Sequence, residues 1–449
     1  MSILQKAQSM LTKHPLCDHC LGRQFALLGY RIENIDRGKA LKLVLALQAS
    51  DIHSSEEAEG IKRLKVLSLN GFSREAKETL HHLKKRIPRK NAPKTCYLCE
   101  DKFQLLDSLT QICLEAAADY QYNTFLVGIE LPVAVEERED EFKASFNVSY
   151  GESMKHEFGR LLGKRIAKET GRTADYLKPD LAIIVNPFAE SVRIQVNPLF
   201  VAGRYRKLVR NIPQSKWFCS QCRGRGCKKC GGTGKMYPES VEELSSELLL
   251  AAAEGQETSF HASGREDIDA RMLGKGRPFV IEISKPKKRF LDLKKLEAAI
   301  NIHAEGKIEI SELSFSSRDA VRRLKKRESA QKEYRVLIEF ESEVSEGCLQ
   351  VLEDRLSRIL IKQQTPLRVL HRRADLIREK YIYEVKVKKM ALKRAEMKIR
   401  CQGGLYVKEL VSGDEGRTKP NISELLENRA KTLELDVLNV IMDDSSKVN

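Results

Sequence analysis

The chain has 449 residues, which is too long for one ordinary domain and predicts about three. Hydrophobic residues make up 41% and charged residues 32%, so folded cores are expected and global disorder is excluded. The formal net charge of +16 predicts a polyanionic partner.

The apolar stretches of the chain are all short. The richest stretch runs only from Leu248 to Ala253, whereas a membrane-spanning helix needs ~20 apolar residues. Residues 1–15 lack the basic region and the apolar block of a secretory signal. We therefore expect a cytoplasmic protein without membrane contact, acting as a monomer.

Residues 1–100 begin and end with C-x-x-C pairs. Between these pairs, apolar residues recur at three- and four-residue intervals over 38–47 and 73–83, which is typical of amphipathic helices. This pattern predicts a helical zinc-binding module.

Residues 101–212 alternate between strand-like and helical patterns. β-Branched residues are frequent in 125–131, 180–185 and 192–196. Residues 154–170 have an apolar face opposite a basic one and are followed by glycine, as in an amphipathic helix. This region is predicted to be an α/β domain.

The charge pattern changes near residue 190. Residues 191–238 contain eleven Lys or Arg and no Asp or Glu. Such a one-sign stretch is the clearest nucleic-acid signal in the sequence, although a solvated basic surface is the plainer alternative. Within it, residues 213–238 are predicted to form a four-cysteine zinc cluster or linker.

Residues 239–449 are predicted to form one mixed α+β domain with a largely antiparallel sheet and flanking helices. Residues 260–273 have the composition of a polar loop. The predicted strands are 279–284, 307–315, 334–340, 381–389 and 397–402, and the predicted helices are 240–254, 291–302, 346–360 and 421–432.

Eight cysteines have the spacing of metal ligands. Cys219, Cys222, Cys227 and Cys230 form C-x2-C-x4-C-x2-C, which places four thiolates in reach of one tetrahedral Zn²⁺. A redox dithiol is the alternative.

The two remaining C-x-x-C pairs are far apart in the sequence. Cys17 and Cys20 could join Cys96 and Cys99 in a second site, a tertiary contact that spacing alone does not establish. Because four thiolates leave no open coordination position, we expect one or two structural zinc ions and chemistry elsewhere.

Common catalytic signatures are absent from the sequence. It contains no P-loop, nucleophile elbow, H-E-x-x-H or Rossmann glycine motif, so we expect no organic cofactor.

Four segments resemble one family. SGREDIDARMLGKGRPF (263–279) and residues 403–426 are similar to the archaeal and eukaryotic "pus ten" family of tRNA pseudouridine synthases, and residues 198–217 and 16–29 match its N-terminal half. The resemblance implies a C-terminal pseudouridine synthase core and an N-terminal THUMP-like RNA-binding half. It also implies tRNA, bound at the T-arm, as substrate, with uridine 54 and/or 55 of the T-loop as target.

The resemblance also implies the site residues. Asp267 lies in the family's R-x-D pattern and would act as nucleophile on a flipped-out uridine, with Arg265 pairing with it. Tyr334 and Tyr406 would contact the base. Asp269 is the rival carboxylate, although for Asp269 and Glu266 we expect solvation or local hydrogen bonding.

Two other functions are weighed against this one. A non-catalytic, zinc-dependent RNA-binding protein would account for the charge and the cysteines. A THUMP-type methylase or thiolase is disfavoured because the sequence lacks a glycine-rich cofactor loop.

Overall fold

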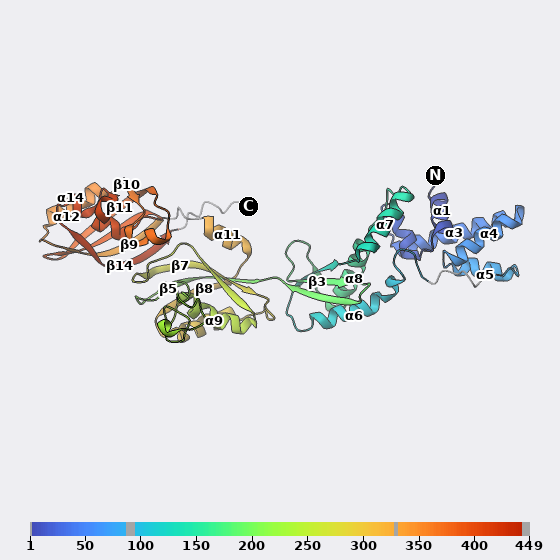
Figure 1. Ribbon diagram of the computed structural model, residues 1–449, viewed down its shortest axis with the longest axis horizontal. Helices are drawn as coiled ribbons and strands as arrows, with labels where there is room; N and C mark the ends of the chain where they lie inside the picture. Colours follow the sequence, from blue (N-terminus) through green and yellow to red (C-terminus); the bar gives the residue numbers. More distant parts are fainter. Residues whose placement is uncertain (1, 87–94, 327–330, 442–449) are drawn as a thin grey trace. The chain divides into compact units, whose positions relative to one another are not determined.

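The structure is a computed structural model that describes residues 2–86, 95–326 and 331–441. The chain divides into two compact units, residues 1–197 and 198–449 (Figure 1). Among the described residues, no helix is long and apolar enough to cross a membrane.

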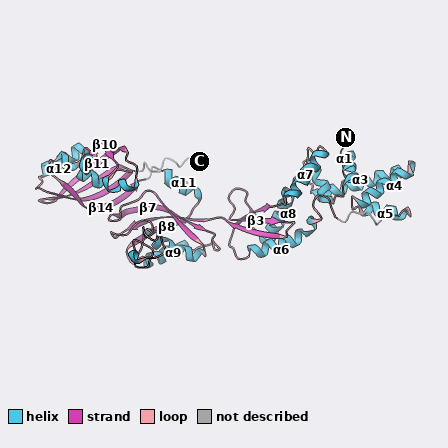
Figure 2. Ribbon diagram, viewed as in Figure 1, coloured by secondary structure: helices cyan, strands magenta, loops and turns pink. Residues whose placement is uncertain are grey.

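The first unit begins with helices, as predicted (Figure 2). Ser2 starts the first helix in a capping box with Gln5, which satisfies two backbone donors. The elements of this part are α1 (Ile3–Lys13), α2 (Asp18–Gly22), η1 (Arg23–Phe25), α3 (Asn34–Ser55), α4 (Glu57–Leu69), α5 (Arg74–His82) and η2 (Lys102–Leu105).

The rest of the first unit is an α/β layer whose sheet has the order β2-β1-β3-β4. Strand β1 pairs in parallel with β3, and β3 pairs antiparallel with β4. The basic helix expected over 154–170 is present and ends at Gly171, whose φ of 68° suits glycine. The elements are α6 (Leu106–Ala117), β1 (Thr124–Ile129), α7 (Val133–Ser145), α8 (Met154–Thr170), β2 (Thr173–Ala174), β3 (Leu181–Asn186) and β4 (Ser191–Val196).

The helical part and the α/β part share one hydrophobic core. Buried residues from Ala7 to Val185 form a single cluster, in which Phe103 stacks on Phe158 of α8 with ring centroids 4.0 Å apart. Residues 1–100 therefore pack with the α/β layer rather than folding around a core of their own.

The second unit is built on a ten-stranded sheet with the order β13-β10-β11-β12-β9-β14-β7-β5-β8, to which β6 adds by pairing with β7. Strands β7 and β14 run parallel, and the other pairs that the described residues form in this sheet are antiparallel. The strands are β5 (Leu199–Lys207), β6 (Glu257–Ala262), β7 (Arg271–Ser284), β8 (Ile308–Phe315), β9 (Gln331–Phe340), β10 (Ile359–Gln364), β11 (Ile377–Ala391), β12 (Arg394–Gln402), β13 (Thr418–Lys419) and β14 (Ala430–Ile441).

Helices cover this sheet. Alternate residues of β7 face opposite sides: Phe279 and Ile281 belong to the main core, whereas Val280 packs against Val321 and Leu324 of α11. The helices are α9 (Val241–Ala253), α10 (Leu293–His303), α11 (Arg318–Lys326), α12 (Glu346–Leu356), α13 (Val407–Ser412) and α14 (Ile422–Leu425), with 3-10 turns η3 (Lys228–Cys230), η4 (Leu367–Arg372) and η5 (Asp414–Gly416). The predicted α+β class is confirmed.

Some predicted elements were wrong. The helix expected over 421–432 ends at Leu425, and residues 430–441 form the central strand β14, which pairs with β9 and β7. Strand β5 pairs with β7 and β8, so residues 199–207 lie in the second unit and not with 101–212. In both places, long-range strand pairing decided the structure over local propensity.

Candidate active site and metal centres

Asp267 lies on the segment that connects β6 to β7, and its side chain is one-third exposed. Two cations bind its carboxylate. Arg368, on η4, has Nη2 3.1 Å from Oδ2 and Nη1 3.3 Å from Oδ1. Lys408, on α13, has Nζ 3.4 Å from Oδ2. These two cations hold the Asp267 carboxylate in a fixed orientation.

Arg265 does not supply this charge. Its guanidinium lies over the Trp217 ring, 5.5 Å from the centroid, and it forms no ion pair with Asp267 among the described residues. The expected pairing of Arg265 with Asp267 was therefore wrong. Arg368 and Lys408 were missed because they are distant in the sequence, although Lys408 lies in the family-like segment 403–426.

Unlike the partly exposed Asp267, Glu266 is buried. Its Oε2 lies 2.9 Å from Nε of buried Arg277 and accepts a hydrogen bond of 2.9 Å from the Tyr205 hydroxyl. That hydroxyl in turn accepts from Gln214 Nε2 at 2.7 Å. The expectation of a solvated or locally bonded Glu266 was wrong, because this network pairs the carboxylate with residues of β5 and β7.

Lys207 at the end of β5 is a buried cation beneath the same segment. Its Nζ donates to the carbonyl oxygens of Asp267, Ile268 and Ile212 at 3.1, 3.0 and 2.9 Å. Burial lowers the pKa of Lys207 to about 8. Two of these hydrogen bonds hold the backbone that carries Asp267, and the third ties it to Ile212. No local pattern in the sequence indicated this role.

Asp269 is the more exposed of the two candidate carboxylates. Its side chain is 59% exposed, and both of its oxygens lie 2.7 Å from Lys408 Nζ. Partial burial opposes ionisation, but the hydrogen bond from Lys408 lowers the pKa of Asp269. Lys408 thus bridges Asp267 and Asp269, and the partner of Asp269 is distant in the sequence rather than local.

Tyr334 and Tyr406 both lie near this segment. Tyr334 is a buried residue of β9, opposite Val437 of β14. Burial raises the pKa of its hydroxyl, and the charges of Asp267 and Glu266 contribute. Tyr406 caps α13, and its ring centroid is 5.8 Å from the Arg368 guanidinium that binds Asp267.

The first group of cysteines comes together from distant parts of the chain. The Sγ atoms of Cys17, Cys20, Cys96 and Cys99 all lie within 4.8 Å of one another, and the Cys17 and Cys99 sulfurs are 3.6 Å apart. Tetrahedral zinc with bonds of ~2.3 Å needs sulfurs about 3.8 Å apart. This group therefore fits a tetrathiolate zinc ion.

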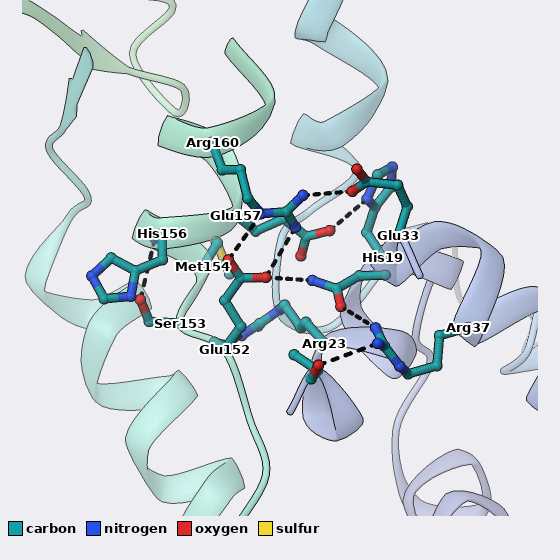
Figure 3. Close-up of polar contacts among 12 residues, drawn as sticks. His19, Arg23, Glu33, Arg37, Glu152, Ser153, Met154, His156, Glu157 and Arg160 are labelled. Carbon is teal, nitrogen blue, oxygen red and sulfur yellow. Dashed lines mark hydrogen bonds and ion pairs between the residues drawn. The ribbon is translucent and has the colours of Figure 1, made fainter. Parts of the chain in front are cut away.

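Polar contacts join the cysteine-bearing helix α2 and its neighbours to α8 and the segment before it (Figure 3). His19 Nδ1 lies 2.8 Å from buried Glu157, and Arg160 of α8 pairs with Glu33 at the start of α3. Glu152 accepts from Asn34 Nδ2 at 2.6 Å. These contacts hold the cysteine-bearing part against the α/β layer.

The second group is compact in the sequence. The sulfurs of Cys219 and Cys227, Cys222 and Cys230, and Cys227 and Cys230 are each 3.8 Å apart, which also fits tetrahedral zinc.

The second group also contains an internal repeat. Residues 219–226 and 227–234 each read C-x-x-C-x-G-x-G. The amides of Gly226 and Gly234 donate to the second sulfur of their own repeat, each at 3.2 Å. Both glycines have positive φ, and a side chain on either would collide with the backbone of the other repeat. The equal spacing of cysteines and glycines could have revealed this duplication.

Comparison with known proteins assigns the family. The family model "Pus10, C-terminal" matches residues 200–441, and "Pus10 THUMP domain, archaeal" matches residues 109–186. The chain belongs to the Pus10 family. It is therefore a pseudouridine synthase, an isomerase, as the resemblance predicted.

Relatives named "tRNA pseudouridine synthase Pus10" match along most of their length. The chain is 38% identical over 442 residues to the protein of Methanothrix thermoacetophila, covering 98% of this chain and 94% of the relative. It is 42% identical over 440 residues to that of Methanocaldococcus jannaschii, covering 96% and 93%. The Methanothermobacter marburgensis protein is 47% identical over 351 residues, covering 77% and 86%.

Proposed function

We propose that this protein isomerises uridine 54, uridine 55 or both in the T-loop of tRNA, with Asp267 as nucleophile on a flipped-out base. One observation carries the assignment of Asp267. Its partly exposed carboxylate is held by two cations, on a segment that one buried ion pair and the buried Lys207 fix in place. The names of the relatives support tRNA as substrate. The T-loop positions rest on the resemblance of the segments around Asp267 and Tyr406.

The reaction breaks the bond between uracil N1 and the ribose C1′ and forms a new one from C5 to C1′. A carboxylate at C1′ assists departure of uracil, either by bonding to the sugar carbon or by stabilising its developing charge. Because a stacked base hides these atoms, the uridine must be flipped out at a cost of a few kcal/mol. Arg368 and Lys408 keep Asp267 in place for that step.

The two tyrosines receive different roles in this proposal. Tyr334 is buried in β9, and burial raises the pKa of its hydroxyl, so the hydroxyl is protonated. We assign Tyr334 to contact with the base. Tyr406, half-buried beside Arg368, is placed to stack on the flipped uracil.

Both four-cysteine groups are assigned to structural zinc. Each offers four sulfurs at tetrahedral spacing and leaves no open coordination position, so zinc would stabilise the fold and not the reaction. In the first unit it would tie α2 to residues 96–99, which follow helices α3, α4 and α5 in the chain.

The test uses unmodified tRNA transcript and purified protein without added cofactor. Pseudouridine is mapped by carbodiimide-stop sequencing after reaction with the natural protein, Asp267→Asn or the matched control Asp269→Asn. We expect T-loop conversion by the natural protein and the control, and none by Asp267→Asn. All three should bind the transcript.

Two outcomes would count against the proposal. Conversion by Asp267→Asn at the natural rate would remove Asp267 as nucleophile. RNA binding without conversion by any variant would favour the non-catalytic RNA-binding alternative.

A further inference from the structure

The cysteine repeat forms a small projecting element with unusual surface charge. We call residues 216–236 the knuckle; Phe218 and Lys235 form a bridge at its base. Its exposed cations are Lys216, Arg223, Arg225, Lys228 and Lys229. None of these five side chains forms an ion pair with a described residue, whereas Lys235 at the base pairs with Glu243, as many surface cations elsewhere in this unit pair with a carboxylate.

Such a cluster is unfavourable for the free protein. The knuckle contains no acidic residue, and a zinc bound by four thiolates would still leave it net positive. Unpaired like charges repel one another and are stabilised when a polyanion binds. The pattern therefore indicates a surface for an anionic partner.

An exposed aromatic side chain lies among these cations. Phe218 is 57% exposed, with Lys216 Nζ 5.1 Å from its ring centroid. A Cβ on Gly224 would lie 3.0 Å from the Phe218 ring. Because glycine has no Cβ, the ring can lie against the cysteine repeat. A flat ring surrounded by cations matches unpaired nucleotides, whose bases stack while their phosphates pair with charge.

The base of the knuckle contacts the segment that carries Asp267. Trp217 of the knuckle lies under the Arg265 guanidinium, and Gln214, two residues before the knuckle, donates from Nε2 to the carbonyl oxygen of Gly264 at 3.0 Å. RNA held by the knuckle would thus be anchored directly beside the catalytic segment.

We propose that the knuckle binds the sugar-phosphate backbone of the substrate RNA, with Phe218 as a stacking platform for one unpaired base. This inference rests on the proposed function only in that the substrate is RNA. It assigns the duplicated cysteine repeat to substrate binding in addition to its zinc-binding role.

The first test removes charge and leaves the cysteines intact. We compare the quadruple variant Arg223→Gln, Arg225→Gln, Lys228→Gln, Lys229→Gln with a matched control at exposed sites elsewhere in this unit: Lys294→Gln, Lys295→Gln, Arg355→Gln, Arg358→Gln. Dissociation constants for unmodified tRNA are measured by fluorescence anisotropy against salt concentration. Zinc content and unfolding temperature show that each variant is folded.

We expect a smaller salt dependence for the knuckle variant alone. Log affinity falls with log salt concentration, and each lost phosphate contact makes this fall less steep by ~0.7–0.9. The loss of four contacts should therefore reduce the steepness by about 3. In turnover, KM should rise at least about tenfold with kcat unchanged, because binding and not chemistry is altered. A slope and KM equal to those of the control would overturn the proposal.

The second test addresses the aromatic ring and does not depend on the charge variant folding. Phe218→Leu should weaken binding of T-arm RNA about five- to hundredfold, and Phe218→Tyr should restore it, since stacking needs the ring. Equal affinity of Phe218→Leu and the natural protein would remove the stacking role.

Two further outcomes separate the possibilities. If the charge variant loses affinity for polyglutamate but not for tRNA, the knuckle serves an acidic polypeptide and the proposal fails. If the natural protein forms no pseudouridine while its tRNA affinity depends on the knuckle, the proposed catalytic function fails and this inference stands.

Discussion

Replacing Glu266 by glutamine tests whether the buried ion pair supports the segment that carries Asp267. Glutamine keeps the shape and an acceptor for Tyr205, but it leaves the Arg277 guanidinium buried and without its counter-charge. Breaking a buried pair in this way lowers the free energy of unfolding by about 3–5 kcal/mol. Because the hydrogen bond from Tyr205 is kept, we expect a loss at the lower end of this range. For a unit of this size, about 3 kcal/mol lowers the unfolding temperature by ~6–12 °C.

The chain provides a local probe for this measurement. Trp217 is the single tryptophan in the sequence, and it contacts Arg265 beside Glu266. Its fluorescence therefore reports unfolding of the second unit in the full-length protein. The matched control is Glu339→Gln, which breaks ion pairs with the exposed Arg394 and Lys431. It should change the stability little, because water screens both pairs.

A double variant sharpens the test. Glu266→Gln with Arg277→Met removes both charges, and it should be more stable than Glu266→Gln alone because the Arg277 charge is no longer buried without its partner. The reasoning is refuted if Glu266→Gln melts within about 2 °C of the Glu339→Gln control, a shift of less than ~1 kcal/mol.

Three further predictions concern the segment and the metal centres. Burial lowers the pKa of Lys207 from 10.5 to about 8, so between pH 8 and 10.5 the unfolded chain binds more protons than the folded one, and the free energy of unfolding should rise with pH. Lys207→Met should flatten this rise, as measured by urea titrations of Trp217 fluorescence at several pH values. A pH dependence unchanged by the substitution would contradict the lowered pKa of Lys207. Arg368→Met should lower kcat about a hundredfold with KM little changed, because Asp267 loses a positioning cation. Arg368→Lys keeps a cation and should lower kcat less. Equal kcat for the two variants would exclude Arg368 as a positioning residue. Metal analysis should find two zinc ions per chain and one in the double variant Cys219→Ser, Cys222→Ser, and full zinc content in that variant would remove the second site.

The sequence by itself determined the local features of this protein. The apolar stripe over 154–170 and the glycine after it specified a helix, and the C-x-x-C spacing within 219–230 predicted four sulfurs in reach of one metal ion, because neighbours along the chain decide both. The resemblance carried by segments 263–279 and 403–426 identified the family, since those motifs are contiguous.

Only the tertiary structure decided which distant residues meet. The cations on Asp267 come from η4 and α13, Glu266 is buried against Arg277, and residues 430–441 form a central strand instead of continuing a helix. Each of these outcomes depends on the free energy of sheet pairing and burial, summed over contacts between residues far apart in the chain. Local propensity and spacing contain no information on those contacts, so the surroundings of Asp267 could not be predicted from its neighbours in the sequence.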